Sequence, residues 1–284
     1  ATSRNRRVSM SSPIRVGAVS YLNAKPLYYR LCDFAPNIRL TMEVPSRLAE
    51  RLAAGTLEVG LIPSIEYFRG VRHGYEILAG FSIAARGPVR SVKLFSRVPF
   101  NRIERLALDE GSRSSQALSL VWLDTCHGVR PGRIESLPLG VPVLESTADA
   151  VLVIGDRAMK VPHEPFCQVV DLAEGWQGMT GLPFVFALWV TRRGVDLGDL
   201  PSALARSRDE GLAHADELAR VHGPRLGLDF STCYDYLTQV LSYELGEPEL
   251  AGLRRFAQMA ARLELVPEGV NLVFHRPRDL AARR

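Results

Sequence analysis

The sequence has few cysteines and histidines, and neither type forms a recognisable motif. Its four cysteines (Cys32, Cys126, Cys167 and Cys233) lie far apart and include no CxxC pair, which argues against a redox motif or a zinc ribbon. We expect them to be free, buried thiols in a reducing compartment. The six histidines show no HxxxH or HExxH spacing, so we also expect no metal site.

Long hydrophobic runs and clustered charges are also missing. No window approaches the ~20 apolar residues of a membrane span, and no apolar segment follows the basic opening "ATSRNRRVSMSS" to make a signal peptide. The formal net charge is only +4, and no basic stripe with interleaved aromatic residues suggests a nucleic-acid partner. We therefore expect a cytoplasmic protein that binds neither nucleic acid nor membrane, with a disordered tail at residues 1–13.

The common catalytic signatures are absent as well. The sequence contains no GxSxG elbow, no GxGxxG fingerprint and no GxxxxGK[ST] phosphate loop. Glu66, Glu110 and Asp156 could act as an acid or a base, but no spacing selects a pair among them. We expect no cofactor, and the mildly positive charge favours a small anion as ligand.

The sequence does contain an alternation of short apolar strands with amphipathic helices. Strand patterns at residues 14–19, 38–44 and 57–64 alternate with helical patterns at 24–32 and 46–55. Ser46 is the predicted N-cap of the second helix and Gly55 its stop signal. This order predicts an open, mostly parallel sheet with helices on both faces.

A second α/β set follows, and then a helical segment. Its strand patterns lie at 103–109, 133–139 and 148–156, with a helical pattern at 114–126 between the first two. Three further helical patterns cover 200–223, 229–246 and the stretch from Pro248 to Leu263. No low-complexity linker separates the sets, so we expect two lobes joined by short crossing strands near 91–96 and 184–190.

Small polar residues gather at the junctions between strands and helices. Ligands of open α/β sheets bind beyond the carboxyl ends of the strands, where helix N-termini present free N–H groups. Any single one of these residues could simply cap a helix, but together they predict a pocket for a carboxylate or a phosphate. The candidates are Ser20, Tyr21, Asn23, Ser64, Ser91, Ser112, Ser114, Ser115, Thr180 and Gly181.

Five segments carry a resemblance to a known family. In order they are "VSYLNAKPL", "VGLIPSIEY", "GSRSSQAL", "ADAVLVIGD" and "TGLPFVFALW". Together they resemble the menaquinone-biosynthesis proteins of the futalosine route, and within that family the chorismate dehydratases. The resemblance runs from Ile14 to Leu265.

The resemblance implies a fold and a reaction. The fold would be that of type II periplasmic binding proteins: two mixed, mostly parallel sheets flanked by helices, with a helical C-terminal segment. Lobe I would comprise 14–92 plus 186–284 and lobe II 93–185, with the ligand cleft between them. The reaction would remove water from chorismate to give 3-[(1-carboxyvinyl)oxy]benzoate. It would need no cofactor, because the ring becomes aromatic and the enolpyruvyl carboxylate of the substrate could take the proton.

The resemblance also implies roles for particular residues. Asn23 matches the asparagine of the first-strand motif and would be the catalytic contact, and Ser91 matches a cleft serine at the lobe crossing. Ser114 and Ser115 match hydroxyl residues that hold a carboxylate, although relatives often carry threonine at the former position. Thr180 and Gly181 would line the wall of lobe II, and Tyr21 would be wall as well.

Two alternatives stay open. One is a non-catalytic small-anion binding protein of the same fold, which as a receptor should carry a signal peptide or a lipobox cysteine and as a transcriptional effector domain a helix-turn-helix segment. The other is the sister lyase that acts on cyclic dehypoxanthine futalosine, for which "SYLNAKPL" is not the usual motif. We expect a monomer or a homodimer that takes a dianionic small molecule.

Overall fold

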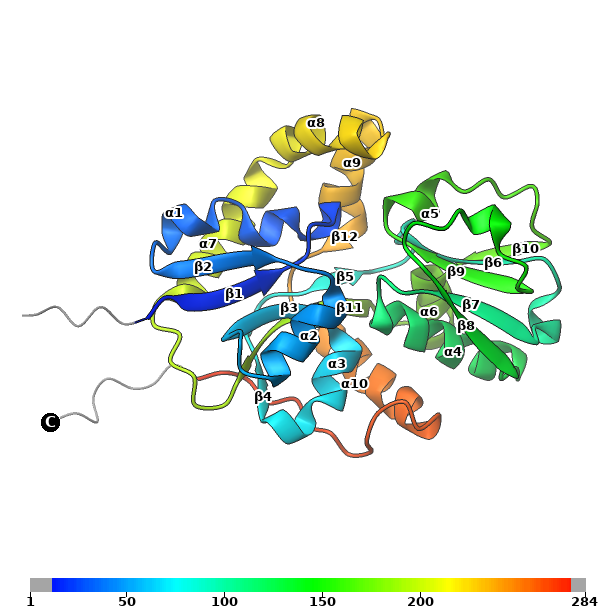
Figure 1. The fold of residues 1–284 in the computed structure, drawn as a ribbon, viewed down its shortest axis with the longest axis horizontal. Helices are drawn as coiled ribbons and strands as arrows, with labels where there is room; N and C mark the ends of the chain where they lie inside the picture. Colours follow the sequence, from blue (N-terminus) through cyan, green and yellow to red (C-terminus); the bar gives the residue numbers. More distant parts are fainter. Residues whose placement is uncertain (1–11, 277–284) are drawn as a thin grey trace, which may run out of the picture.

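The computed structural model describes residues 12–276 and folds them into two α/β lobes, each built on one sheet (Figure 1). The predicted tail at 1–13 therefore lies almost wholly outside the described residues. We name the lobe with the seven-stranded sheet lobe I and the lobe with the five-stranded sheet lobe II. The residue boundaries given above for the lobes stay a prediction.

The sheet of lobe I combines early and late segments of the chain. Its strand order is β12-β5-β11-β3-β1-β2. The remaining strand, β4, pairs with β11 and is not part of this linear order. β1 runs parallel to β2 and β3, whereas β11 runs antiparallel to β3, β4 and β5. The strands are β1 (Ile14–Ala18), β2 (Ile38–Met42), β3 (Val59–Pro63), β4 (Tyr75–Ile77), β5 (Ile83–Ala85), β11 (Phe184–Arg192) and β12 (Leu241–Ser242).

The sheet of lobe II has the order β10-β6-β9-β7-β8. β7 is parallel to β8 and β9, and β6 is antiparallel to β9 and β10. Two mixed sheets with helices were predicted and are confirmed, but the expectation of mostly parallel pairing was wrong, because antiparallel ladders are as numerous or more so. The strands are β6 (Val92–Ser96), β7 (Arg105–Asp109), β8 (Arg133–Leu137), β9 (Ala150–Ile154) and β10 (Gln168–Asp171).

The helices cover the sheets and form most of the C-terminal third. Among them α7 packs on the 3-10 helix η1, and α10 packs on β11. The α-helices are α1 (Leu31–Phe34), α2 (Pro45–Ala53), α3 (Ser64–Arg69), α4 (Arg113–His127), α5 (Asp156–Lys160), α6 (Leu172–Thr180), α7 (Leu200–Ala213), α8 (Ala215–Leu226), α9 (Phe230–Asp235) and α10 (Glu247–Arg262). Shorter turns are the 3-10 helices η1 (Leu22–Tyr28), η2 (Val71–His73), η3 (Phe100–Arg102) and η4 (Val143–Glu145), and the π-helical turn η5 (Tyr236–Val240).

Several local predictions need correction. The helix predicted at 24–32 is the 3-10 helix η1 followed by the short α1. Ser46 is not an N-cap, because α2 already begins at Pro45, whose fixed φ suits the first helical position. The pattern at 229–246 is helical only to Val240, and the chain then forms β12 beside β5, a long-range pairing that helical periodicity cannot reveal.

The thiols differ from the prediction too. All four cysteines are free, but only Cys233 is buried, while Cys32, Cys126 and Cys167 are exposed. The lack of a CxxC motif argues against a redox or zinc site, but it does not show which face of an element each cysteine occupies.

Aromatic packing fixes the place where the chain returns from lobe II to lobe I. The ring of Phe184, at the start of β11, lies 5.4 Å from that of Trp176 on α6 and 4.8 Å from that of Phe256 on α10, both edge to face. A Cβ on Gly252 would lie 2.1 Å from the carbonyl oxygen of Pro183, so glycine is required for α10 to approach this crossing. The crossing is thus part of the core, and the cleft opens beside it.

Candidate functional site

A cavity lies between the lobes where strand ends of both sheets meet. Its space is about 820 Å³, open solvent included. The wall includes residues that follow β1 in lobe I and β7 and β9 in lobe II, the strand ends at which ligands bind in open α/β sheets. From β3 it includes Leu61 and Pro63, the last residue of that strand. The polar residues of the wall are Tyr21, Asn23, Ser91, Ser112, Ser115, Asp156 and Tyr236.

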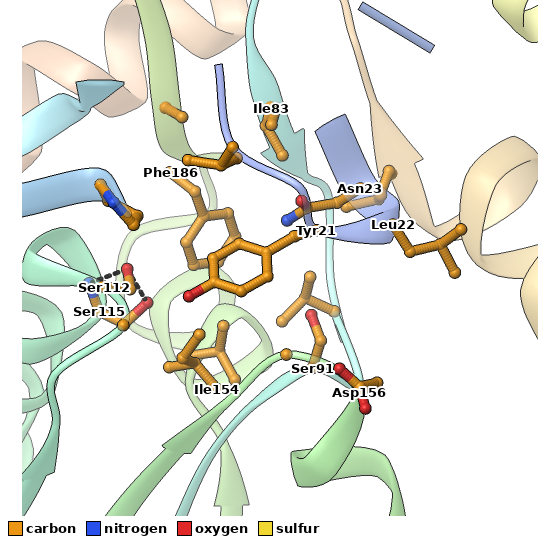
Figure 2. Close-up of a pocket in the computed structure, with 18 of the residues that line it drawn as sticks. Tyr21, Leu22, Asn23, Ile83, Ser91, Ser112, Ser115, Ile154, Asp156 and Phe186 are labelled. Carbon is orange, nitrogen blue, oxygen red and sulfur yellow. Dashed lines mark hydrogen bonds between the residues drawn. The ribbon is translucent and has the colours of Figure 1, made fainter. Parts of the chain in front are cut away.

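The remainder of the wall is mainly apolar. Ile83, Phe186 and Ile154 face the same space as the ring of Tyr21 (Figure 2), and Leu61 and Val89 also line it. None of the described lining residues is a lysine or an arginine. Such a cavity suits a small ring whose charged or polar substituents are met by hydroxyls, amides and backbone N–H groups.

One side of the cavity carries a cluster of three polar side chains. The hydroxyl of Ser91 lies 2.8 Å from the phenol oxygen of Tyr236, and Asn23 lines the wall beside them. Burial raises the pKa of Tyr236 to about 12, while its contacts with the Ser91 and Asn23 side chains act in the opposite direction. The Oδ1 atom of Asn23 is buried and has no hydrogen-bond partner within residues 12–276.

The opposite side is formed by the start of α4. Ser112 is the N-cap, and its Oγ accepts a hydrogen bond from the N–H of Ser115 at 3.2 Å. The two hydroxyls are 2.9 Å apart, and Figure 2 shows them across the Tyr21 ring from Ser91. The first N–H groups of a fifteen-residue helix favour an anion, so this side suits a carboxylate.

Behind this side lies the fully buried carboxylate of Asp109. It accepts hydrogen bonds from the N–H of Gly111 (2.9 Å), the N–H of Ile154 (3.0 Å) and Nη2 of Arg157 (2.7 Å). Burial and then the charge of Asp109 raise the pKa of Tyr21 to about 12, so its phenol is a neutral donor at neutral pH. Asp109 thus fixes the loops that carry the α4 side of the cavity.

Comparison with known proteins decides the family. A family model described as menaquinone biosynthesis matches residues 14–262. The chain belongs to this family. A chorismate dehydratase of Thermus thermophilus is 34% identical over 87% of this chain and 94% of its own length, and one of Campylobacter jejuni is 26% identical over 88% and 98%.

Family members bear more than one enzyme name. A 1,4-dihydroxy-6-naphtoate synthase of Thermus thermophilus is 27% identical over 88% of this chain and 94% of its own length. These relatives are lyases, so the family includes more than one lyase activity.

Solved structures show the same fold. The alkanesulfonate-binding protein SsuA from Xanthomonas axonopodis pv. citri superposes with a TM-score of 0.66 at 16% identity, covering 91% of this chain and 95% of that one. The periplasmic aliphatic sulphonate binding protein SsuA from Escherichia coli gives 0.67 at 14% identity, covering 96% and 95%. The predicted type II periplasmic-binding-protein fold is therefore confirmed.

The structure brings five of the ten candidate residues into the wall: Tyr21, Asn23, Ser91, Ser112 and Ser115. Ser64 and Ser114 are fully buried behind it, with their hydroxyl oxygens 3.1 Å apart across the two lobes. Ser64 also donates to the carbonyl of Val185 at 2.7 Å. These two serines connect α3 of lobe I to α4 of lobe II.

Ser20, Thr180 and Gly181 are not among the lining residues. Ser20 is exposed. The hydroxyl of Thr180 donates to the carbonyl of Trp176 at 2.8 Å, and Gly181, with φ of +70°, ends α6. Both precede β11 and so lie at its amino end, whereas the cavity is lined by Phe186 and Ala187 further along the strand.

Tyr236 is the polar wall residue that sequence analysis missed, and Met159 and Leu228 are apolar ones. Tyr236 lies within an amphipathic pattern in which an aromatic residue is most simply read as core. The residue type offered one signal. A buried tyrosine usually needs a hydrogen-bond partner for its hydroxyl, so Tyr236 could have been considered as a polar residue as well as a core residue.

Two further observations concern residues 12–276. No group of three or more histidine, cysteine, aspartate or glutamate side chains there is arranged to hold a metal ion. In the same part of the chain, every helix is too short or too polar to span a bilayer.

Proposed function

We propose that the protein is a carbon–oxygen lyase that dehydrates chorismate to 3-[(1-carboxyvinyl)oxy]benzoate. Support comes from the family, from the higher identity to the Thermus thermophilus chorismate dehydratase (34%) than to its naphtoate synthase (27%), and from the first-strand motif "SYLNAKPL". The match to that relative covers 94% of its length.

The observation that carries the proposal is the separation of polar groups across an apolar cavity. Asn23 and Ser91 lie on one side, and Ser112 and Ser115 lie on the other (Figure 2). Tyr236 belongs to the first side, because its hydroxyl lies 2.8 Å from that of Ser91. Chorismate is a six-membered ring with a carboxylate at C1 and a hydroxyl at C4, at opposite ends of the ring. The α4 side would hold the carboxylate, and the Asn23 side would receive the hydroxyl.

The chain's own residues then have limited chemical work to do. Apolar side chains such as Ile83 and Phe186 hold the ring and exclude water, which strengthens every hydrogen bond inside the cavity. Asn23 faces the departing C4 hydroxyl. Its unpaired Oδ1 can accept the hydroxyl hydrogen, and its N–H₂ group can donate to the charge that develops on the oxygen during the reaction. Loss of the C3 hydrogen and the C4 hydroxyl makes the ring aromatic, which supplies the driving force.

The experiment mixes the purified protein with chorismate, without added metal or cofactor, and follows products by chromatography and mass spectrometry. We expect a product lighter by one water with benzoate absorbance. Chorismate that stays intact but raises the melting temperature would favour a binding protein instead. If it neither reacts nor binds, the proposal fails, and cyclic dehypoxanthine futalosine is the next compound, because the naphtoate synthase also matches this chain.

A further inference from the structure

Tyr236 presents a phenol to the cavity from an unusual local structure. It begins the π-helical turn η5 (Tyr236–Val240), a rare conformation that often occurs at functional sites. Its side chain is almost entirely buried, with 3% of the residue exposed, yet it lines the cavity. A buried phenol that reaches a ligand cavity can hydrogen-bond to the ligand.

The hydrogens of this cluster can be counted. Ser91 and Tyr236 share one hydrogen bond of 2.8 Å, so one of their two hydroxyl hydrogens is left over. An asparagine amide reaches a phenol oxygen as a donor only through its N–H₂ group. The Asn23 contact lowers the pKa of the phenol, as expected when Asn23 is the donor. When Ser91 donates as well, the phenol hydrogen is the one left over, and it is available to a ligand in the cavity.

We propose that Tyr236 is a catalytic residue, the proton donor that turns the departing hydroxyl of the substrate into water. This inference rests on the proposed dehydration of chorismate. The C3–H bond breaks, its proton passes to the enolpyruvyl carboxylate, and its electron pair forms the ring double bond as the C4–O bond breaks. The leaving oxygen takes the proton of Tyr236, and the phenolate recovers a proton from the carboxylic acid just formed, so one water leaves in total.

The acidity of Tyr236 fits this task. With a pKa of about 12 the phenol stays protonated at neutral pH. Water has a pKa of about 15.7, so transfer of a proton from the phenol to a departing hydroxide is downhill. The polar contacts with Ser91 and Asn23 also stabilise the phenolate that is formed.

The first test compares Tyr236→Phe with Tyr243→Phe, two changes that each remove one buried phenol hydroxyl. Tyr243 is equally buried, but it does not line the cavity and its hydroxyl has no partner within residues 12–276. We expect Tyr236→Phe to lower kcat by roughly 10²–10⁴-fold, the usual contribution of a general acid, with KM changed only a few-fold. Tyr243→Phe should retain wild-type kcat.

The second test places a ring-fluorinated, more acidic tyrosine at position 236, which keeps the packing and the hydroxyl. If Tyr236 is the acid, the fall of kcat at alkaline pH moves to lower pH, and a purely structural role would leave the profile unchanged. A superimposable profile, or a Tyr236→Phe variant within about threefold of wild-type kcat, overturns the role of Tyr236 alone. A wild-type protein that leaves chorismate unchanged overturns the proposed function together with this role.

Discussion

The two sides of the cavity differ in how completely their buried polar groups are paired. On the lobe II side, Asp109 is fully buried and accepts hydrogen bonds from Gly111, Ile154 and Arg157. On the opposite side, the buried Oδ1 of Asn23 has no partner within the described residues. A buried, unpaired polar atom costs about 1–3 kcal/mol, so its presence in a ligand cavity indicates a ligand contact. On the paired side Asp109 is the scaffold behind Ser112 and Ser115, and on the unpaired side the ligand completes the hydrogen bonding of Asn23.

The largest effect should follow from breaking the paired side. Asp109→Ala leaves Arg157 and two N–H groups without their acceptor, and we expect a loss of about 3–5 kcal/mol in the free energy of unfolding, measured with urea. The control is Glu135→Ala, whose partner Arg105 is more exposed, and it should cost about 1 kcal/mol or less. Equal losses in the two variants would contradict the assignment of Asp109 as scaffold.

A change on the unpaired side should instead affect turnover. Asn23→Asp is nearly isosteric but places a negative charge beside a dianionic substrate, and we expect kcat to fall by roughly 10²–10³-fold. The unfolding free energy should stay within about 1 kcal/mol of wild type. Asn101→Asp makes the same change at an exposed position outside the cavity wall and should not alter the kinetics. Undiminished turnover in Asn23→Asp would remove Asn23 from the mechanism.

A third prediction concerns the close approach of Tyr21, from lobe I, to Gly111, from lobe II. A Cβ on Gly111 would lie 2.9 Å from the Tyr21 hydroxyl and 3.0 Å from Cδ1 of Ile154, so Gly111→Ala should displace the phenol. We expect KM to rise about tenfold, or ~1.4 kcal/mol. In a Tyr21→Phe background the added methyl should cost less, which a double-mutant cycle measures. Gly140→Ala, with open space around its Cβ, is the control, and additive effects would argue against this contact.

The smallest effect is a change in the pH dependence of stability. Burial raises the pKa values of Tyr21, Tyr75 and Tyr236 from 10.0 to about 12. Above pH 10 the unfolded chain loses these phenol protons before the folded chain does, so the free energy of unfolding should fall between pH 10 and 12. In the Tyr236→Phe variant the free energy of unfolding should fall less between pH 10 and 12 than in wild type. Urea unfolding at several pH values measures the difference. A stability that rises across this range would contradict the burial of these phenols.

Much of the architecture could be predicted from local patterns. The buried strands β1, β3 and β9 and the helix α4 appear in the sequence as apolar runs and helical spacing, and the polar residues after β1 and β7 identify the correct end of the sheet. Each of these features depends on a short segment, so the hydrophobic pattern of that segment is enough to predict it.

The parts that could not be predicted depend on contacts between distant segments. The pairing of β12 with β5, and the antiparallel direction of β11, are set by how the chain crosses between lobes. Tyr236 reaches Ser91 over 145 positions of sequence, so its place in the site could not be inferred from its neighbours. Thr180 and Gly181 show the converse, because they begin the motif "TGLPFVFALW" but lie outside the cavity wall.

The most direct test is a crystal structure of the Tyr236→Phe variant soaked with chorismate, which this slow variant should leave intact. We expect chorismate between the lobes, with its C4 hydroxyl facing Asn23 and Ser91 and its ring carboxylate at Ser112 and Ser115. Chorismate bound in the reverse orientation, or outside this cavity, would contradict the account.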